Sequence, residues 1–294
     1  MTKSLELLAP AKLNLFLHII GRRADGYHLL QSVFQLIDWT DTVHLTSLNR
    51  DAIERTNPLP NVNPENDLTV RAAHLLKKYS GTKSGVAIEL TKSIPMGAGL
   101  GGGSSDAASV LIGLNTLWEL HLDTKVLMSL GAQLGADIPF FIFGKNAFVE
   151  GVGEKLSSVP VAERRYFVLF PGKSISTADV FQSPALIRDH TPLSIEALNP
   201  QLLHHQSFTN DCQLAAIQIC SEVQNALDWL QLRFPKSHPV MTGSGSSTFI
   251  TLEDSDTLDF LQVALKELPP GWVGRVVRGL NQNPAYNSVI RNKL

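Results

Sequence analysis

The stretch that most constrains this chain is a glycine-rich segment at residues 95–109, PMGAGLGGGSSDAAS. Its five glycines let backbone N–H groups approach an anion closely, because no Cβ stands in the way. Ser104, Ser105 and Asp106 then mark the start of a helix, whose first N–H groups carry about half a positive charge. A serine-capped structural turn is the alternative. The number of glycines and the helix start favour a phosphate-binding loop.

Two well-known nucleotide loops match this segment only in part. Gly97 and Gly102 have the spacing of a Walker loop, but the lysine of that motif is missing. Together with Gly99 they spell G-x-G-x-x-G, the fingerprint of dinucleotide-binding folds, which requires an acidic residue after the next strand. The acids at about that distance, Glu119 and Asp123, lie between two expected helices. We therefore expect a phosphate loop whose positive charge comes from elsewhere.

Composition narrows the classes of partner. The 294 residues carry a net charge of −2, which disfavours bulk binding to nucleic acid or to a membrane surface. Cys212 and Cys220 are the only cysteines, so a disulfide framework is absent and a reducing compartment is expected. The apolar run LNLFLHII is followed by GRRADGYH without a cleavage site, which favours a buried strand over a signal peptide. We expect a cytoplasmic protein with no nucleic acid, membrane or obligate protein partner.

The first half of the chain contains both the two-residue apolar alternation of strands and the apolar spacing of helices. Residues 49–66 form a proline- and asparagine-rich surface loop. A helix begins after Asp67, a plausible N-cap, and stops near Gly81. The other expected elements are strands at 12–20, 32–38, 42–47 and 85–95, helices at 104–118 and 123–134, and turns and strands over 135–156.

The second half follows a change in composition near residues 153–165 and again mixes strands and helices. Expected there are strands at 166–170, 238–243, 246–251 and 272–279, and helical segments at 176–188, 211–232 and 255–267. The sequence predicts an α+β protein of two domains, residues 1–156 and 157–294.

Several segments of the chain resemble those of one family of kinases. The glycine segment resembles the P-x-G-x-G-L-G-S-S loop of the GHMP kinase superfamily, and PAKLNLFLHIIGRRADGYH resembles the opening of its 4-diphosphocytidyl-2-C-methyl-D-erythritol kinases, of the non-mevalonate isoprenoid pathway. LGADIPFFIFG, EGVGE, FTNDC and MTGSGSSTF follow in the family's order. The resemblance implies a two-domain GHMP kinase fold with its active site in the interdomain cleft. It also implies ATP as phosphoryl donor, with Mg²⁺ accompanying the nucleotide.

The resemblance assigns catalysis to Lys12 and Asp137. Asp137 would accept the proton of the substrate's 2-hydroxyl, and Lys12 would stabilise the charge that develops on oxygen. Lys12 would thus supply part of the charge missing from the loop. The residues alone favour a structural role for both: Lys12 as a strand lysine that reaches solvent, and Asp137 as a helix cap or turn residue before Pro139.

The remaining site residues also come from the resemblance. Tyr27 and His28 would hold the cytidine by stacking and by polar contact, with Thr177 and Phe181 completing the pocket. Asn14, on the strand face of Lys12, would bind the erythritol part. Without the family, GRRADGYH is a plain surface turn. The ATP-binding residues would be Pro95, Met96, Gly97, Ala98, Gly99, Leu100, Gly101, Gly102, Gly103, Ser104 and Ser105.

Several points stay open in the sequence. The glycine turn TGSGSS at 242–247 would lie near the phosphates, and ENDL places Asp67 where the family tends to have asparagine, so the adenine contacts are unassigned. His204-His205 lacks the spacing of a metal site, and metal ligands are unknown. Two hypotheses compete with this one. The first is a kinase of homoserine or mevalonate, which the GYH motif and Phe181 disfavour. The second is a non-enzymatic relative, which Lys12 and Asp137 disfavour.

Overall fold

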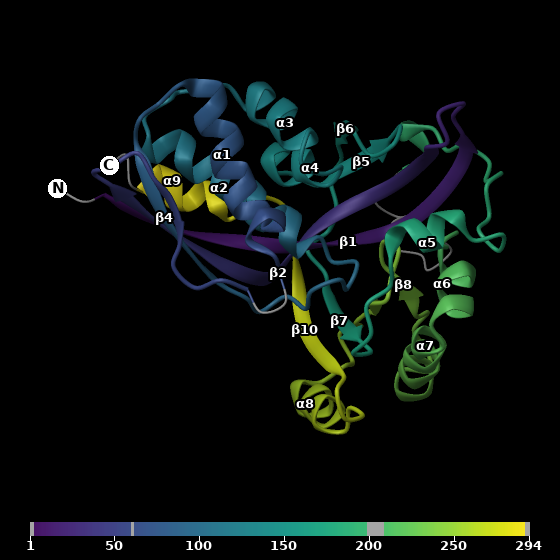
Figure 1. Ribbon diagram of the computed structural model, residues 1–294. Helices are drawn as coiled ribbons and strands as arrows, with labels where there is room; N and C mark the ends of the chain where they lie inside the picture. The colour runs from purple at the N-terminus through teal and green to yellow at the C-terminus, as the bar shows by residue number, and fades with distance from the viewer. Residues whose placement is uncertain (1–2, 60–61, 199–208, 292–294) are drawn as a thin grey trace.

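Two long antiparallel strands lie at the centre of the fold in this computed structural model, which describes residues 3–59, 62–198 and 209–291. They are β1 (Ser4–Arg22) and β2 (His28–Leu48), and they run through both halves of the molecule (Figure 1). We expected two separate strands at 32–38 and 42–47, and this is wrong. Residues 39–41 continue β2, because a register shift at Pro10/Ala11 of β1 keeps the ladder paired.

One mixed sheet connects the two halves of the chain. β2 pairs with β5 (Ala147–Glu150) through residues 32–34 and with β4 (Gly85–Thr91) through residues 42–48. β5 in turn pairs with β6 (Lys155–Ser158), and β4 pairs with β3 (Ile53–Arg55). At its middle β2 also pairs with the end of β10 (Val273–Leu280). The sheet continues from β10 through β7 (Arg165–Phe170), β9 (Thr248–Thr251) and β8 (Val240–Met241).

Helices cover the two parts of this sheet separately. On the first part the helices bury a shared apolar core, and they are α1 (Leu68–Ser80), α2 (Gly102–Leu117), α3 (Thr124–Ala132), α4 (Ile138–Phe143) and α9 (Ala285–Arg291). On the second part lie α5 (Thr177–Gln182), α6 (Gln213–Ile219), α7 (Glu222–Arg233) and α8 (Leu258–Lys266). The short 3₁₀ turns are η1 (Pro64–Asn66) and η2 (Ile195–Ala197).

The structure corrects several expected elements. The loop at 49–66 contains β3 and η1. The stretch IPFFIF, expected among turns and strands, forms α4. The helix was not predicted because five of its six residues are buried, and an all-apolar run has no amphipathic period that identifies a helix. The expected helix at 211–232 is two helices that break at Cys220, and the segment at 176–188 is helical only over α5.

The mixture of helices and a mixed sheet confirms the α+β prediction. The division at residues 156/157 stays a prediction. The end of the chain returns to the first half, since β10 joins β2 and Ala285 of α9 is fully buried in the core beneath α2. In the described parts of the chain, no helix combines the length and apolarity needed to cross a membrane.

Candidate active site

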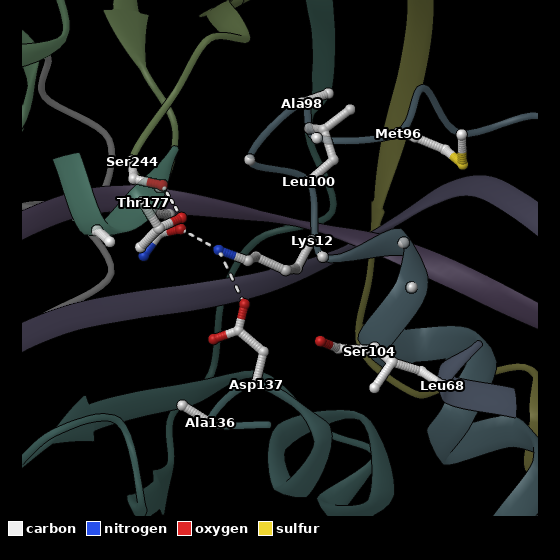
Figure 2. A pocket seen from close by; sticks show the side chains of 18 of the residues that line it. Lys12, Leu68, Met96, Ala98, Leu100, Ser104, Ala136, Asp137, Thr177 and Ser244 are labelled. Carbon is white, nitrogen blue, oxygen red and sulfur yellow. Dashed lines mark hydrogen bonds and ion pairs between the residues drawn. The ribbon is translucent and has the colours of Figure 1, made fainter. Parts of the chain in front are cut away.

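A cavity of about 960 Å³ lies where β1, the glycine segment and the first residues of α2, α4 and α5 meet (Figure 2). It is also lined by the β1–β2 turn and by the second glycine turn at 242–247. Every site residue predicted from the sequence lines this cavity except Ser105, which is fully buried. The fold thus brings together residues that are more than 160 positions apart.

Lys12 and Asp137 face each other across the cavity. Lys12 Nζ and Asp137 Oδ2 are 3.7 Å apart, and the lysine side chain is 4% exposed, so it does not reach out to solvent (Figure 2). The ammonium donates to Asn14 Oδ1 and lies 4.7 Å from the centre of the Phe34 ring. A buried charge requires such partners. These contacts hold the ammonium inside the site.

Asp137 stands at the N-cap position of α4, yet its side chain makes no capping hydrogen bond. The expected cap or turn role therefore does not engage the carboxylate, which is 33% exposed and directed toward Lys12. A carboxylate that is partly open to the cavity and paired with an ammonium is available as a proton acceptor.

Asn14 holds Lys12 from the same strand face, as the alternation of β1 predicts. Its amide nitrogen donates to Ser32 Oγ at 2.9 Å, and its backbone N–H donates to Thr242 Oγ1 at 2.8 Å. Asn14 therefore links Lys12 to β2 and to the second glycine turn.

The glycine segment and the second glycine turn pack against each other. Gly99 has a φ of 77°, and a Cβ there would lie 2.7 Å from the carbonyl oxygens of Thr242 and Gly245. Ser247 N–H donates to the Ala98 carbonyl at 3.1 Å. The close approach requires glycine at position 99, and it explains why two glycine-rich turns occur in one chain.

The start of α2 lies two residues before the expected start at Ser104. The helix begins at Gly102, its N-cap is Gly101 in the left-handed region, and no side chain caps it. The expected start at Ser104 is therefore wrong, and no serine caps the helix as the alternative interpretation required. Residues 101–104 line the cavity, so the first N–H groups of a 16-residue helix are available to an anion there.

A buried ion cluster, which the sequence analysis missed, lies beside this helix start. Lys92 Nζ donates to Asp41 and, at 2.8 Å, to Asp106 Oδ2. Burial, opposed by Lys92 and reinforced by Asp41, raises the pKa of Asp106 to about 7. A Cβ on Gly102 would lie 3.2 Å from Lys92 Nζ. Lys92 is thus a second cation next to the glycine segment, and its place three residues before Pro95 was the available signal.

The residues predicted to hold a cytidine come from two segments. Tyr27 lies in the β1–β2 turn and is 65% exposed, whereas His28, at the start of β2, is buried. The rings of His28 and Phe181 of α5 have centroids 5.3 Å apart. Thr177 Oγ1 and Ser244 Oγ share a hydrogen bond of 2.8 Å (Figure 2). Burial and the nearby Arg188 and Arg22 lower the pKa of His28.

The departure at ENDL has a structural reason. Asp67 accepts the N–H of Thr69 at 2.9 Å as the N-cap of α1, and Arg55 Nε lies 3.0 Å from its other oxygen. These hydrogen bonds outweigh burial and lower the pKa of Asp67. Asn66 and Asp67 both line the cavity. Because the Asp67 carboxylate is already engaged, the neighbouring Asn66 is the freer polar group.

His204-His205 lies outside the described residues. Within the described ranges, no group of three or more His, Cys, Asp or Glu side chains gathers as a metal cluster would. The two cysteines are free thiols, and the buried Cys212 has its pKa raised to about 12 by burial.

Comparisons with known proteins identify relatives of the whole chain. Residues 67–145 match the model of the GHMP kinases N terminal domain. A protein of Polynucleobacter asymbioticus named 4-diphosphocytidyl-2-C-methyl-D-erythritol kinase is 57% identical, over 98% of this chain and 97% of the relative. One of the same name from Burkholderia multivorans is 45% identical over 97% of both chains.

Comparison with solved structures indicates the same family as these relatives. A crystal structure of 4-(cytidine 5'-diphospho)-2C-methyl-D-erythritol kinase has a TM-score of 0.80 at 32% identity, covering 94% of this chain and 100% of that one. A homoserine kinase from Cytophaga hutchinsonii, 16% identical, shares the fold with a TM-score of 0.68 and covers 96% of both chains. The predicted GHMP kinase fold is confirmed, and the chain belongs to the 4-diphosphocytidyl-2-C-methyl-D-erythritol kinase family of the GHMP kinases.

Proposed function

We propose that this protein transfers the γ-phosphoryl group of ATP to the 2-hydroxyl of 4-diphosphocytidyl-2-C-methyl-D-erythritol, a step of the non-mevalonate isoprenoid precursor pathway. Membership of the family named for this substrate supports the proposal. The single observation on the chain itself that carries it is the ion pair of Lys12 and Asp137 at the cavity, in which the lysine is buried and its Nζ lies 3.7 Å from Asp137 Oδ2.

Phosphoryl transfer depends mainly on positioning and on charge stabilisation. The substrate oxygen forms a bond to the γ-phosphorus while the bond to the ADP oxygen breaks. Asp137 accepts the hydroxyl proton. Lys12, held by Asn14 and Phe34, stabilises the negative charge that develops on the attacking oxygen, and it also pairs with the Asp137 carboxylate. Loss of a general base of this kind typically reduces the rate by about 10²–10⁴-fold.

The phosphates of ATP bind at the glycine segment and the uncapped start of α2. Unpaired helix N–H groups and the helix dipole attract phosphate. Lys12 and Lys92 flank the segment and replace the lysine that a Walker loop carries within itself. The backbone of residues 95–104 forms this site, and Ser105 supports it from beneath as a fully buried residue.

Mg²⁺ accompanies the nucleotide, and oxygen atoms of this chain fit such an ion. Asp106 Oδ1 is buried without a hydrogen-bond partner among the described residues, and Asp106 and Ser104 both line the cavity. Magnesium prefers oxygen ligands and is commonly held by one or two carboxylates plus phosphate. When bound, the ion neutralises phosphate charge. Asp106 and Ser104 are therefore the residues that would hold it.

The cytidine lies against Tyr27, His28, Thr177 and Phe181. Aromatic rings on a base contribute about 1–3 kcal/mol per stacked face, which is enough to set substrate choice. The active site lies in a cleft between domains 1–156 and 157–294. The protein acts in the cytoplasm on its small-molecule substrates, without nucleic acid, membrane or an obligate protein partner.

Release of ADP with three alcohols tests the proposal. The purified protein is incubated with ATP, Mg²⁺ and either the cytidine diphosphate substrate, homoserine or mevalonate, and ADP is followed by a coupled assay. We expect turnover with the cytidine substrate and background release with the other two. Equal or faster release with homoserine or mevalonate would assign the protein to another alcohol.

A further inference from the structure

Arg188, in the loop after α5, lies behind the wall that Phe181 and His28 present to the cavity. Its guanidinium donates to carbonyl oxygens of the α5 end and the following loop, namely Phe181 at 3.3 Å, Ser183 at 2.8 Å and Leu186 at 2.9 Å. Its remaining nitrogen, Nε, donates to His28 Nε2 at 3.1 Å. Arg188 therefore connects the two segments of the proposed base pocket, although it does not line the cavity.

The contact between Arg188 and His28 determines where the histidine proton sits. A guanidinium has donors and no acceptor, so His28 Nε2 must accept. A neutral imidazole then carries its proton on Nδ1. Burial and the positive charges of Arg188 and Arg22 lower the pKa of His28 and so disfavour the imidazolium form. Among the described residues Nδ1 has no hydrogen-bond partner, and His28 lines the cavity, so Nδ1–H is left as a donor for a ligand.

We propose that Arg188 is a positioning residue that holds His28 as the neutral Nδ1–H tautomer, and that this donor makes the pocket select cytosine over uracil. The inference rests on the proposed function. N3 of cytosine only accepts a hydrogen bond, whereas N3 of uracil carries a hydrogen and only donates. Nδ1–H therefore complements the cytosine N3 and opposes the uracil N3–H. A site that leaves a buried donor unpaired rejects the wrong ligand strongly.

The bonds of Arg188 to the three carbonyls make this arrangement stiff. The planar guanidinium has five donors in a fixed fork, so bonds on one side set the direction of the bond on the other. Lysine, with a point charge on a flexible stem, cannot reproduce this geometry. Arg188→Lys keeps the charge beside His28 and loses the directed donor, whereas Arg188→Met loses both.

The first readout is ¹⁵N NMR of histidine side chains, with the His28 signals assigned by their loss in His28→Gln. We expect a protonated, pyrrole-type Nδ1 and an unprotonated, pyridine-type Nε2 in the wild-type protein without substrate. Arg188→Met should shift the pattern toward a mixture of tautomers. A wild-type His28 protonated on Nε2 would overturn the proposal, and this measurement needs no variant of Arg188 to fold.

The second readout is the ratio of kcat/KM for the cytidine substrate to that for its uridine analogue. We expect at least about a tenfold preference in wild type, and at least about a fivefold loss of that preference in Arg188→Met and Arg188→Lys, with KM for ATP little changed. A purely structural role would lower both rates and leave their ratio unchanged, which would overturn the proposal.

A matched control loosens the same loop without touching His28. Ser183 Oγ accepts the N–H of Ala185 at 3.2 Å, so Ser183→Ala removes one loop hydrogen bond. It should keep the cytidine preference, and loss of the preference there would overturn the role of Arg188. If wild type uses neither diphosphate, the proposed function fails and the selectivity with it. The NMR pattern of the free protein distinguishes that outcome from a wrong tautomer.

Discussion

Replacing Gly101 with alanine tests whether the start of α2 and Lys12 are built as one unit. Gly101 is the N-cap of α2, with a φ of 73° in the left-handed region. An added Cβ would lie 2.9 Å from Phe141 Cζ and 3.2 Å from Lys12 Cγ. Phe141 is fully buried in the core and has little room to move. The methyl group must therefore displace the helix start, Lys12 or both.

The size of the effect follows from two contributions. The left-handed conformation costs a residue with a Cβ about 1–2 kcal/mol. Overpacking a dense core costs about 1–3 kcal/mol. Together they predict that Gly101→Ala lowers the free energy of unfolding by about 2–5 kcal/mol. For a protein of this size, 1 kcal/mol corresponds to roughly 2–4 °C, so Tm should fall by roughly 4–20 °C.

The catalytic effect should exceed what the stability loss explains. A misplacement of about 1 Å in a positioned group costs about 10²-fold. We therefore expect kcat of Gly101→Ala to fall at least about tenfold at a temperature where the variant is fully folded. Scanning fluorimetry gives Tm, and ADP release gives kcat.

Gly103→Ala is the matched control for stability. Gly103 lies inside α2 without a positive φ, and a Cβ there would meet only Leu68 Cδ1 at 3.7 Å, an ordinary contact. Alanine is the better helix former, so Tm should stay level or rise. Equal losses of Tm in both variants, or a Gly101→Ala protein as stable and active as wild type, would refute this reasoning.

Three further changes test other parts of the account. Asp137→Asn should lower kcat by about 10²–10⁴-fold with little change in Tm, because Asp137 makes no capping bond; a kcat within about threefold of wild type would remove its assigned role. Tyr27→Ala should raise KM for the cytidine substrate about tenfold or more with kcat and KM for ATP little changed, and Tyr27→Phe should lose much less; a selective rise in KM for ATP would mean that the two nucleotide pockets are exchanged. His18, stacked on His190 with ring centroids 3.4 Å apart, has its pKa lowered from 6.5 to about 4 by burial and by His190. The neutral His18 therefore contributes stability that is fully present above pH 6.5 and is lost as pH falls toward 4. In urea unfolding, the free energy of unfolding of His18→Gln should fall by about 2 kcal/mol less than that of wild type between about pH 7.5 and pH 5. Equal losses in the two proteins would contradict this assignment.

Local signals made part of the site predictable from the sequence. The glycine segment required a close backbone approach, and the two-residue alternation of β1 placed Asn14 beside Lys12. Asp67 and Gly81 correctly marked the two ends of α1. These predictions depend on interactions within a few residues, which sequence patterns express directly.

Interactions that depend on strand register and on packing between elements were not predictable. The cluster of Asp41, Lys92 and Asp106 forms because β2 pairs with β4 next to the start of α2. Only the family resemblance, and not the spacing, joined Lys12 to Asp137. Arg188 lies in a loop with no recognisable motif, and its role depends on which atoms surround it.

The products made by the wild-type protein and by Asp137→Asn show whether this chain phosphorylates the 2-hydroxyl and whether Asp137 is needed for it. The cytidine diphosphate substrate, labelled with ¹³C at C2, is incubated with ATP and Mg²⁺ and followed by ³¹P and ¹³C NMR. We predict one new phosphomonoester coupled to C2 for each ADP formed, an intact diphosphate, and almost no product from Asp137→Asn. ADP formed together with inorganic phosphate alone, a phosphoryl group on another hydroxyl, or undiminished product from Asp137→Asn would contradict the account.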